Sequence, residues 1–161
     1  MKKTIKESMK HISLLQQQIN SITQEENNNN FINYANSKDK DETDFDFEAV
    51  NQEIEALNAE ILKIRSAINK ANQTTMVGVN DYSISDALIR IAQLSANSER
   101  FKILASNKQK DRNSTFSGSI EYTEYLYDVK VAKELYLTTV EKIHQLQTAV
   151  DKANILTEIE I

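Results

Sequence analysis

Hydrophobic residues recur every three or four positions over four long stretches of the chain, and this spacing predicts four α-helices. The stretch 47–72 is the most regular, because its apolar positions alternate steps of three and four residues without a slip. Charged and amide residues lie between them, as in a coiled-coil seam. The other three stretches cover residues 5–22, 84–104 and 128–154. The apolar positions of the seam are Phe47, Val50, Ile54, Leu57, Ile61, Ile64 and Ile68.

The segments between these helices differ in kind. Residues 24–46 contain four consecutive asparagines and an acidic run, which predicts a flexible acidic, Asn-rich loop. Residues 75–82 are typical of a short extended turn, after which Ser83 or Ser85 is suited to cap the third helix. Residues 116–127 alternate in polarity like a strand. We expect this last segment to pair with 75–82 as a small hairpin or sheet at one end of the bundle.

Composition supports a mainly all-α fold. The 161 residues include no proline, no cysteine and only two glycines, too few for the turns of a β-sandwich or barrel. We therefore predict a single helical domain over 1–161, an antiparallel long-helix bundle or coiled coil with short strands at one end. The four helices carry more apolar surface than the core of a single bundle of this size can bury. We therefore expect a homo-oligomer that associates through helix seams.

Charge and hydropathy narrow the choice of partners and compartment. The net charge of −5 disfavours nucleic acid and anionic membranes as partners. No run approaches the ~18 apolar residues of a membrane span, and no apolar segment follows the basic start. A cytoplasmic location is the expectation.

Sequence motifs for catalysis are missing. His11 and His144 have Leu15 and Thr148 four positions later, so neither forms a helical zinc pair. Two glycines cannot build a phosphate-binding loop, and the acidic run lacks the glycine and the glutamate of a calcium loop. We expect a protein that is not an enzyme and has no metal site and no cofactor.

Several short segments, taken in order, resemble the septicolysin-like family, a group of small helical bacterial and phage proteins without an assigned activity. The segments are Ile-Asn-Lys-Ala-Asn-Gln-Thr-Thr at 68–75, Ser-Ile-Ser-Asp-Ala-Leu-Ile-Arg at 83–90, Asp111-Arg112, Asp128-Val129, and the stretch 146–154. The family's pattern has tryptophan where Ile155 stands, aspartate at Gln147 and arginine at His144. Family resemblance at Asn72, Thr75, Arg90, Arg112 and Asn154 implies a shared site.

Arginine and tyrosine around the predicted strands suggest one ligand chemistry. Arg112 supplies a planar fork for phosphate or carboxylate, and Tyr122 supplies a stacking face for a nucleobase. The alternative is structural: the tyrosines cover the bundle end, and Arg112 pairs with Glu121 or Glu124.

Polar residues at the end of the second helix have two readings. Asn72 and Thr75 either form a polar cup at a subunit interface, with Arg90 directed into it, or they bond to local backbone groups. In the second case Asn72 is the left-handed residue that ends the helix.

Two functions follow from these observations. The first is a non-enzymatic oligomer that holds a small anionic, nucleotide-like ligand at subunit interfaces, through Asn72, Thr75, Arg90, Arg112, Tyr122 and Asn154. For a phage member this means sequestering a host signalling nucleotide. The alternative is a structural or protein-interaction coiled-coil module without a small-molecule ligand.

Overall fold

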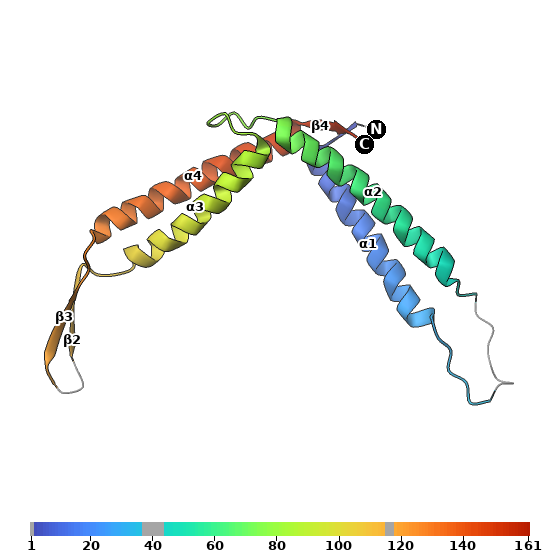
Figure 1. Ribbon diagram of the computed structural model, residues 1–161, viewed down its shortest axis with the longest axis horizontal. Helices are drawn as coiled ribbons and strands as arrows, with labels where there is room; N and C mark the ends of the chain where they lie inside the picture. Colours follow the sequence, from blue (N-terminus) through green and yellow to red (C-terminus); the bar gives the residue numbers. More distant parts are fainter. Residues whose placement is uncertain (1, 37–43, 115–117) are drawn as a thin grey trace. The chain divides into compact units, whose positions relative to one another are not determined.

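The computed structural model describes residues 2–36, 44–114 and 118–161, and it is mainly helical (Figure 1). Its described residues form the four predicted helices, with bounds close to those expected from the apolar spacing except at the end of the first helix. The helices are α1 (Ile5–Asn29), α2 (Phe47–Thr74), α3 (Ile84–Ala105) and α4 (Val129–Leu156). The prediction of a mainly helical fold with small antiparallel strand pairs is confirmed.

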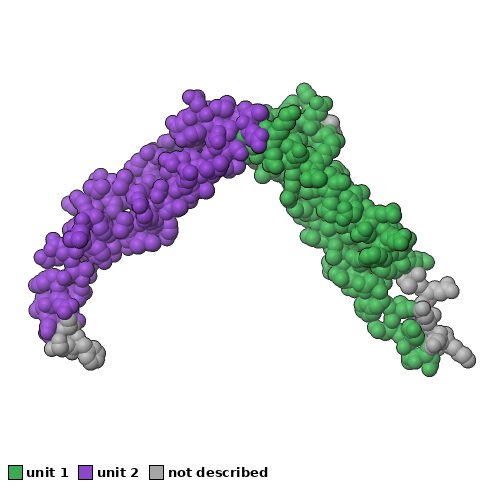
Figure 2. All heavy atoms as spheres, viewed as in Figure 1, with its two compact units in different colours: residues 1–72, 154–161 green, residues 73–153 purple. Residues whose placement is uncertain are grey.

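Contacts divide the chain into two compact units (Figure 2). Unit 1 takes residues 1–72 and 154–161, and unit 2 takes residues 73–153. The single helical domain predicted over 1–161 stays a prediction.

Unit 1 is an antiparallel pair of helices, α1 and α2, which lie side by side (Figure 1). His11 Nε2 on α1 lies 2.9 Å from Glu60 Oε1 on α2 and ties the two helices together. The buried core of this pair follows the predicted spacing of three or four residues in the first half of α1 and the second half of α2. Its buried members are Ile5, Ile12 and Leu15 on α1 and Ile61, Ile64 and Ile68 on α2.

The chain ends meet in a strand pair that the sequence did not predict. Strand β1 (Lys2–Thr4) is antiparallel to β4 (Glu158–Glu160), and Lys3 lies opposite the buried Ile159. Each strand has three residues, which is too short for an alternating pattern to be recognised.

The predicted loop starts too early. Residues 24–29 belong to α1, whose last turn closes with a hydrogen bond from the Asn30 N–H to the Glu26 carbonyl at 2.9 Å. Gln24, Glu25 and Glu26 are good helix formers and continue the helix past its last buried residue. Residues 30–36 and 44–46 form neither helix nor strand, and residues 37–43 of the predicted loop lie outside the described residues.

Unit 2 joins α3 and the greater part of α4 through a hairpin of β2 (Lys110–Ser114) and β3 (Ile120–Glu124). The expected pairing of 116–127 with 75–82 is wrong, because β3 pairs with β2 instead. The segment 75–82 closes on itself through a bridge between Met76 and Ser83, and Gly78 has the left-handed φ of +73° that its turn needs. Ser83 caps α3 by accepting a hydrogen bond from the Asp86 N–H at 3.1 Å.

Candidate functional site

The β2–β3 hairpin brings two of the predicted site residues together. Arg112 on β2 lies directly opposite Tyr122 on β3 in the antiparallel register. Directly opposed residues project from the same face of a sheet, and so do residues two positions apart on one strand. Lys110 therefore shares this face, and its ammonium lies 5.2 Å from the centre of the Tyr122 ring. We call Lys110, Arg112 and Tyr122 the hairpin cluster.

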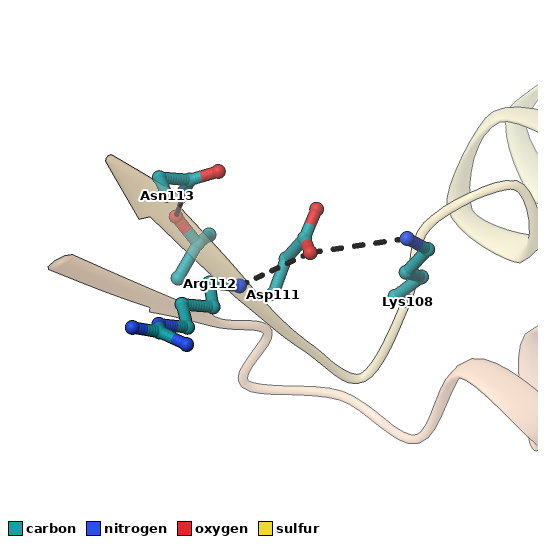
Figure 3. A network of polar contacts seen from close by, with 5 residues as sticks. Lys108, Asp111, Arg112 and Asn113 are labelled. Carbon is teal, nitrogen blue, oxygen red and sulfur yellow. Dashed lines mark hydrogen bonds and ion pairs between the residues drawn. The ribbon is translucent and has the colours of Figure 1, made fainter. Parts of the chain in front are cut away.

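The guanidinium of Arg112 has no hydrogen-bond or ion-pair partner within the described part of the chain. The alternative pairing with Glu121 or Glu124 is absent there, since Glu124 Oε2 lies 3.7 Å from the Lys110 ammonium instead. Asp111 Oδ1 accepts a hydrogen bond from the Arg112 backbone N–H at 3.0 Å and lies 3.9 Å from Lys108 Nζ. Figure 3 shows the Arg112 side chain directed away from this carboxylate. An exposed, unneutralised cation thus lies beside a tyrosine ring that is 63% exposed.

Two neighbouring tyrosines, Tyr125 and Tyr127, have structural contacts. The Tyr127 hydroxyl donates to the Leu104 carbonyl at 2.8 Å and accepts from Asn107 Nδ2 at 2.8 Å. Tyr125 packs edge-on against Tyr127 with ring centroids 5.6 Å apart. Gln109 fixes the same segment by donating to the carbonyls of both tyrosines, so this segment joins the hairpin to the helices.

Arg90 lies far from the hairpin cluster. It is in the second turn of α3, where its guanidinium donates to Gln93 Oε1 at 3.1 Å. Fifteen residues separate Arg90 from the end of α3, which is about 22 Å at ~1.5 Å per residue. Arg90 and Arg112 of one chain therefore do not hold the same small ligand.

The remaining predicted residues divide between the units. Asn72 and Asn154 belong to unit 1, and Thr75 belongs to unit 2, where its carbonyl accepts from the Ile84 N–H at 2.9 Å. Asn154 lies near the end of α4 and is half-buried. The polar cup that combines Asn72, Thr75 and Arg90 stays a prediction.

Asn72 is not the left-handed residue that ends its helix. It lies inside α2, and the described non-glycine residues with positive φ are Asn80 and Asp81. Its Oδ1 atom is buried without a hydrogen-bond partner. A hollow of about 510 Å³ adjoins it, also lined by Arg65 and Asn69. The sequence analysis missed Arg65, although it stands one heptad before Asn72 in the same helix.

Among the described residues, no group of histidine and acidic side chains is placed to hold a metal ion. In the same part of the chain, no helix combines the length and the apolar character needed to cross a bilayer.

Neither Lys110 nor Arg65 stands out in the sequence, because isolated cations on helices and strands are common on solvated surfaces.

The chain matches no protein-family model and no curated protein. Its structure is similar to the crystal structure of a functionally unknown conserved protein from Corynebacterium diphtheriae. The TM-score is 0.70, the identity is 16%, and the match covers 99% of this chain and 100% of that one. This similarity shows a shared fold.

Proposed function

We propose that this protein is a non-enzymatic homo-oligomer that binds a small anionic, nucleotide-like molecule at subunit interfaces. The observation that supports this best is the hairpin cluster, in which an unpaired Arg112 lies opposite the exposed Tyr122. For a phage member, the role is to sequester a host signalling nucleotide. Membership of the septicolysin-like family and a cytoplasmic location belong to the same proposal.

The chemistry of the hairpin cluster suits a nucleotide. A guanidinium keeps its charge at all working pH values and grips two oxygens of a phosphate at once. A tyrosine ring offers a stacking face, and base–aromatic stacking contributes ~1–3 kcal/mol per base. A purely structural hairpin needs neither an unpaired arginine nor an exposed ring.

An oligomer would explain how the separated arginines act together. In one chain, about 22 Å of α3 separates Arg90 from the end of the helix that leads to the hairpin, by its rise of ~1.5 Å per residue. A second chain that brings its Arg90 to the first chain's hairpin would complete the site.

Exposed apolar residues on α3 support association. Ile89 and Ile103 are 59% and 60% exposed, and the exposed Ala92 and Ala96 lie between them at helical spacing. The stripe on α2 that first suggested an oligomer is different, because its members Ile61, Ile64 and Ile68 are buried within unit 1. We therefore place the oligomer seam on the α3 stripe Ile89, Ala92, Ala96 and Ile103.

The second candidate function is a structural or protein-interaction module, in which the α3 stripe is the whole functional surface. The same exposed Ile89 and Ile103 favour it. The two functions differ in whether a small molecule accompanies the protein.

The first test is mass spectrometry of the purified and then denatured protein, which we expect to release a bound nucleotide. Calorimetric titration with cyclic and linear nucleotides then measures affinity. We expect Arg112→Ala to weaken binding at least tenfold, since a charge-assisted hydrogen bond contributes ~1.5–3 kcal/mol. The matched control is Lys133→Ala, which removes one exposed cation from α4.

Thermal melting separates binding from folding. We expect Arg112→Ala to have the same melting temperature as the wild type, because removing an exposed charge outside a network changes the free energy of unfolding by about 0.5 kcal/mol or less. If no nucleotide is released and none binds, the proposed nucleotide binding is wrong and the structural module is the better account of the function. The same conclusion follows if Arg112→Ala is unfolded in the absence of ligand.

A further inference from the structure

The β2–β3 hairpin in unit 2 has open edges. Its sheet has two strands, so within the described residues neither outer edge is hydrogen-bonded to a third strand. Both strands are exposed over nearly all of their length. An isolated two-stranded hairpin is marginally stable in water, and an unpaired edge is a template for a strand of another chain. The hairpin therefore has the properties of a sheet that another strand completes.

The register shows which backbone groups of β3 face outward. Opposed residues of an antiparallel pair alternate between those that exchange backbone hydrogen bonds and those that direct these groups away from each other. The Tyr125 N–H donates to the Gln109 carbonyl at 3.1 Å, so this pair, which continues the strand register, is a hydrogen-bonded one. Alternate residues of β3 therefore bond to β2, and those between them present their N–H and C=O groups at the outer edge. The outward-facing residues are Ile120, Tyr122 and Glu124.

The two edges of the hairpin differ in their protection against pairing. The outward-facing residues of β2 include Arg112 at its centre, so a second β2 strand placed antiparallel on it would oppose two arginines, which is destabilising. The edge of β3 has Tyr122 at its centre, and Ile, Tyr and Thr are residue types that favour strands. β3 contains no proline and no lysine, and its register has no bulge, although these are the usual protections of an exposed edge. The β3 edge is therefore the one suited to a second strand.

We propose that the β3 edges of two copies of this chain pair antiparallel about a two-fold axis at Tyr122, which joins the two hairpins into a four-stranded sheet. Tyr122 of each copy exchanges its N–H and C=O bonds with Tyr122 of the other, and Ile120 does so with Glu124. No like charges are opposed in this register. A contact between two five-residue edges is smaller than the ~1,000 Å² of a stable interface, so the pairing rests on the proposed function, whose α3 seam holds the copies together.

Side chains on both faces of the sheet suit this register. On one face the two Tyr122 rings form a cross-strand aromatic pair, flanked by Arg112 of each copy. On the other face Glu121 lies opposite Thr123 of the second copy, at the close spacing of a non-hydrogen-bonded pair. The Thr123 hydroxyl accepts from Asn113 Nδ2 at 2.9 Å, and within the described chain its own hydrogen has no acceptor, so it can donate to that carboxylate. The second copy thereby adds an arginine and a tyrosine to the hairpin cluster.

The chain has no cysteine, so introduced cysteines report the register directly. In the proposed pair, the Cα atoms of Glu121 and the second copy's Thr123 lie about 4.5 Å apart, within the range of a disulfide. A mixture of the Glu121→Cys and Thr123→Cys proteins, oxidised at micromolar concentration without nucleotide, should give the mixed disulfide dimer as its main cross-linked product. Mass spectrometry identifies this dimer, because its two chains differ in mass.

The matched control is Asn113→Cys, because Asn113 lies opposite Glu121 on β2 and away from the β3 edge. Two strand spacings, about 9.6 Å, would separate it from the second copy's Thr123, beyond the ~7 Å limit for a disulfide. A mixture of Asn113→Cys with Thr123→Cys should therefore give at least tenfold less mixed dimer.

Hydrogen exchange of the unmodified full chain, followed by NMR, is the second measurement. The outward-facing Tyr122 amide should be protected at least tenfold more than the amide of Lys110, which faces the free edge of β2. This measurement decides the outcome even if a cysteine variant loses its hairpin.

Equal yields of mixed dimer from the Glu121→Cys and Asn113→Cys mixtures would overturn the pairing, and so would a Tyr122 amide that exchanges as fast as that of Lys110. If light scattering shows an oligomer and either of these results is found, the pairing alone fails. The proposed function fails on different results, namely no nucleotide released from the purified protein and none bound in the calorimetric panel. Neither measurement of the pairing contains nucleotide, so the two failures are distinguishable.

Discussion

Glu7 shows how one side chain fixes the start of a helix. Its carboxylate accepts hydrogen bonds from the Thr4 backbone N–H at 2.8 Å and from the Thr4 hydroxyl at 3.0 Å. The Thr4 hydroxyl in turn accepts from the Glu7 N–H at 3.2 Å, which completes a capping box. The bonds from Thr4, the backbone one first, favour the charged form and lower the pKa of Glu7 from its ordinary value of 4.5.

The lowered pKa predicts a pH dependence. A carboxylate whose pKa is lower in the folded than in the unfolded state stabilises the fold above the unfolded pKa. That stabilisation disappears as the pH falls below about 4.5 and through the lowered value. Glu7→Gln resembles the protonated state, so we expect it to be less stable than the wild type at neutral pH and to approach it in acid. Urea unfolding of both proteins across this range measures the difference, and a difference independent of pH would contradict the prediction.

Tyr127 gives a second prediction at this scale, because its hydroxyl has two partners, Leu104 and Asn107. Tyr127→Phe removes both hydrogen bonds and should lower the free energy of unfolding by about 1–3 kcal/mol, since each bond contributes ~0.5–1.5 kcal/mol. Tyr122→Phe is the matched control, since the Tyr122 ring is exposed, and it should have little effect. Chemical denaturation compares the two variants, and equal losses would show that the Tyr127 bonds contribute nothing.

At the scale of the element, α2 carries large apolar residues at both buried and exposed positions. Ile64 is 0% exposed, whereas Leu62, two residues earlier on the same helix, is 70% exposed. We expect Ile64→Ala to cost ~2–5 kcal/mol of unfolding free energy, because it leaves a cavity between α1 and α2. Leu62→Ala should change stability by about 0.5 kcal/mol or less. Urea unfolding measures both, and a small effect of Ile64→Ala would contradict the packing of this pair.

At the scale of the whole molecule, the α3 stripe predicts self-association. Light scattering at micromolar concentration should give a multiple of the mass of the chain. Replacing Ile89 and Ile103 together by Glu should yield the monomer, because charges in an apolar seam are left desolvated and unpaired. Exchanging the exposed Leu14 of α1 for Glu is the control and should leave the mass unchanged. A monomeric wild type would refute the homo-oligomer.

The sequence by itself determined the features that depend on neighbours three or four residues apart. The four helices, a serine cap at the start of α3 and the buried positions Ile61, Ile64 and Ile68 all follow from local spacing. The prediction was wrong at the end of α1. The asparagine-rich composition suggested a loop from residue 24, but the helix-forming residues 24–26 continue the helix to Asn29.

Tertiary structure alone decided which distant segments meet. The pairing of β1 with β4 joins the two ends of the chain, and the pairing of β3 with β2 rather than with 75–82 places Tyr122 against Arg112. The hollow beside Arg65 likewise needs α1 beside α2 before Arg65 and Asn72 line a common surface with Ser13. Such contacts depend on loop closure and on the packing of whole helices. The local pattern of apolar and polar residues predicts neither of these.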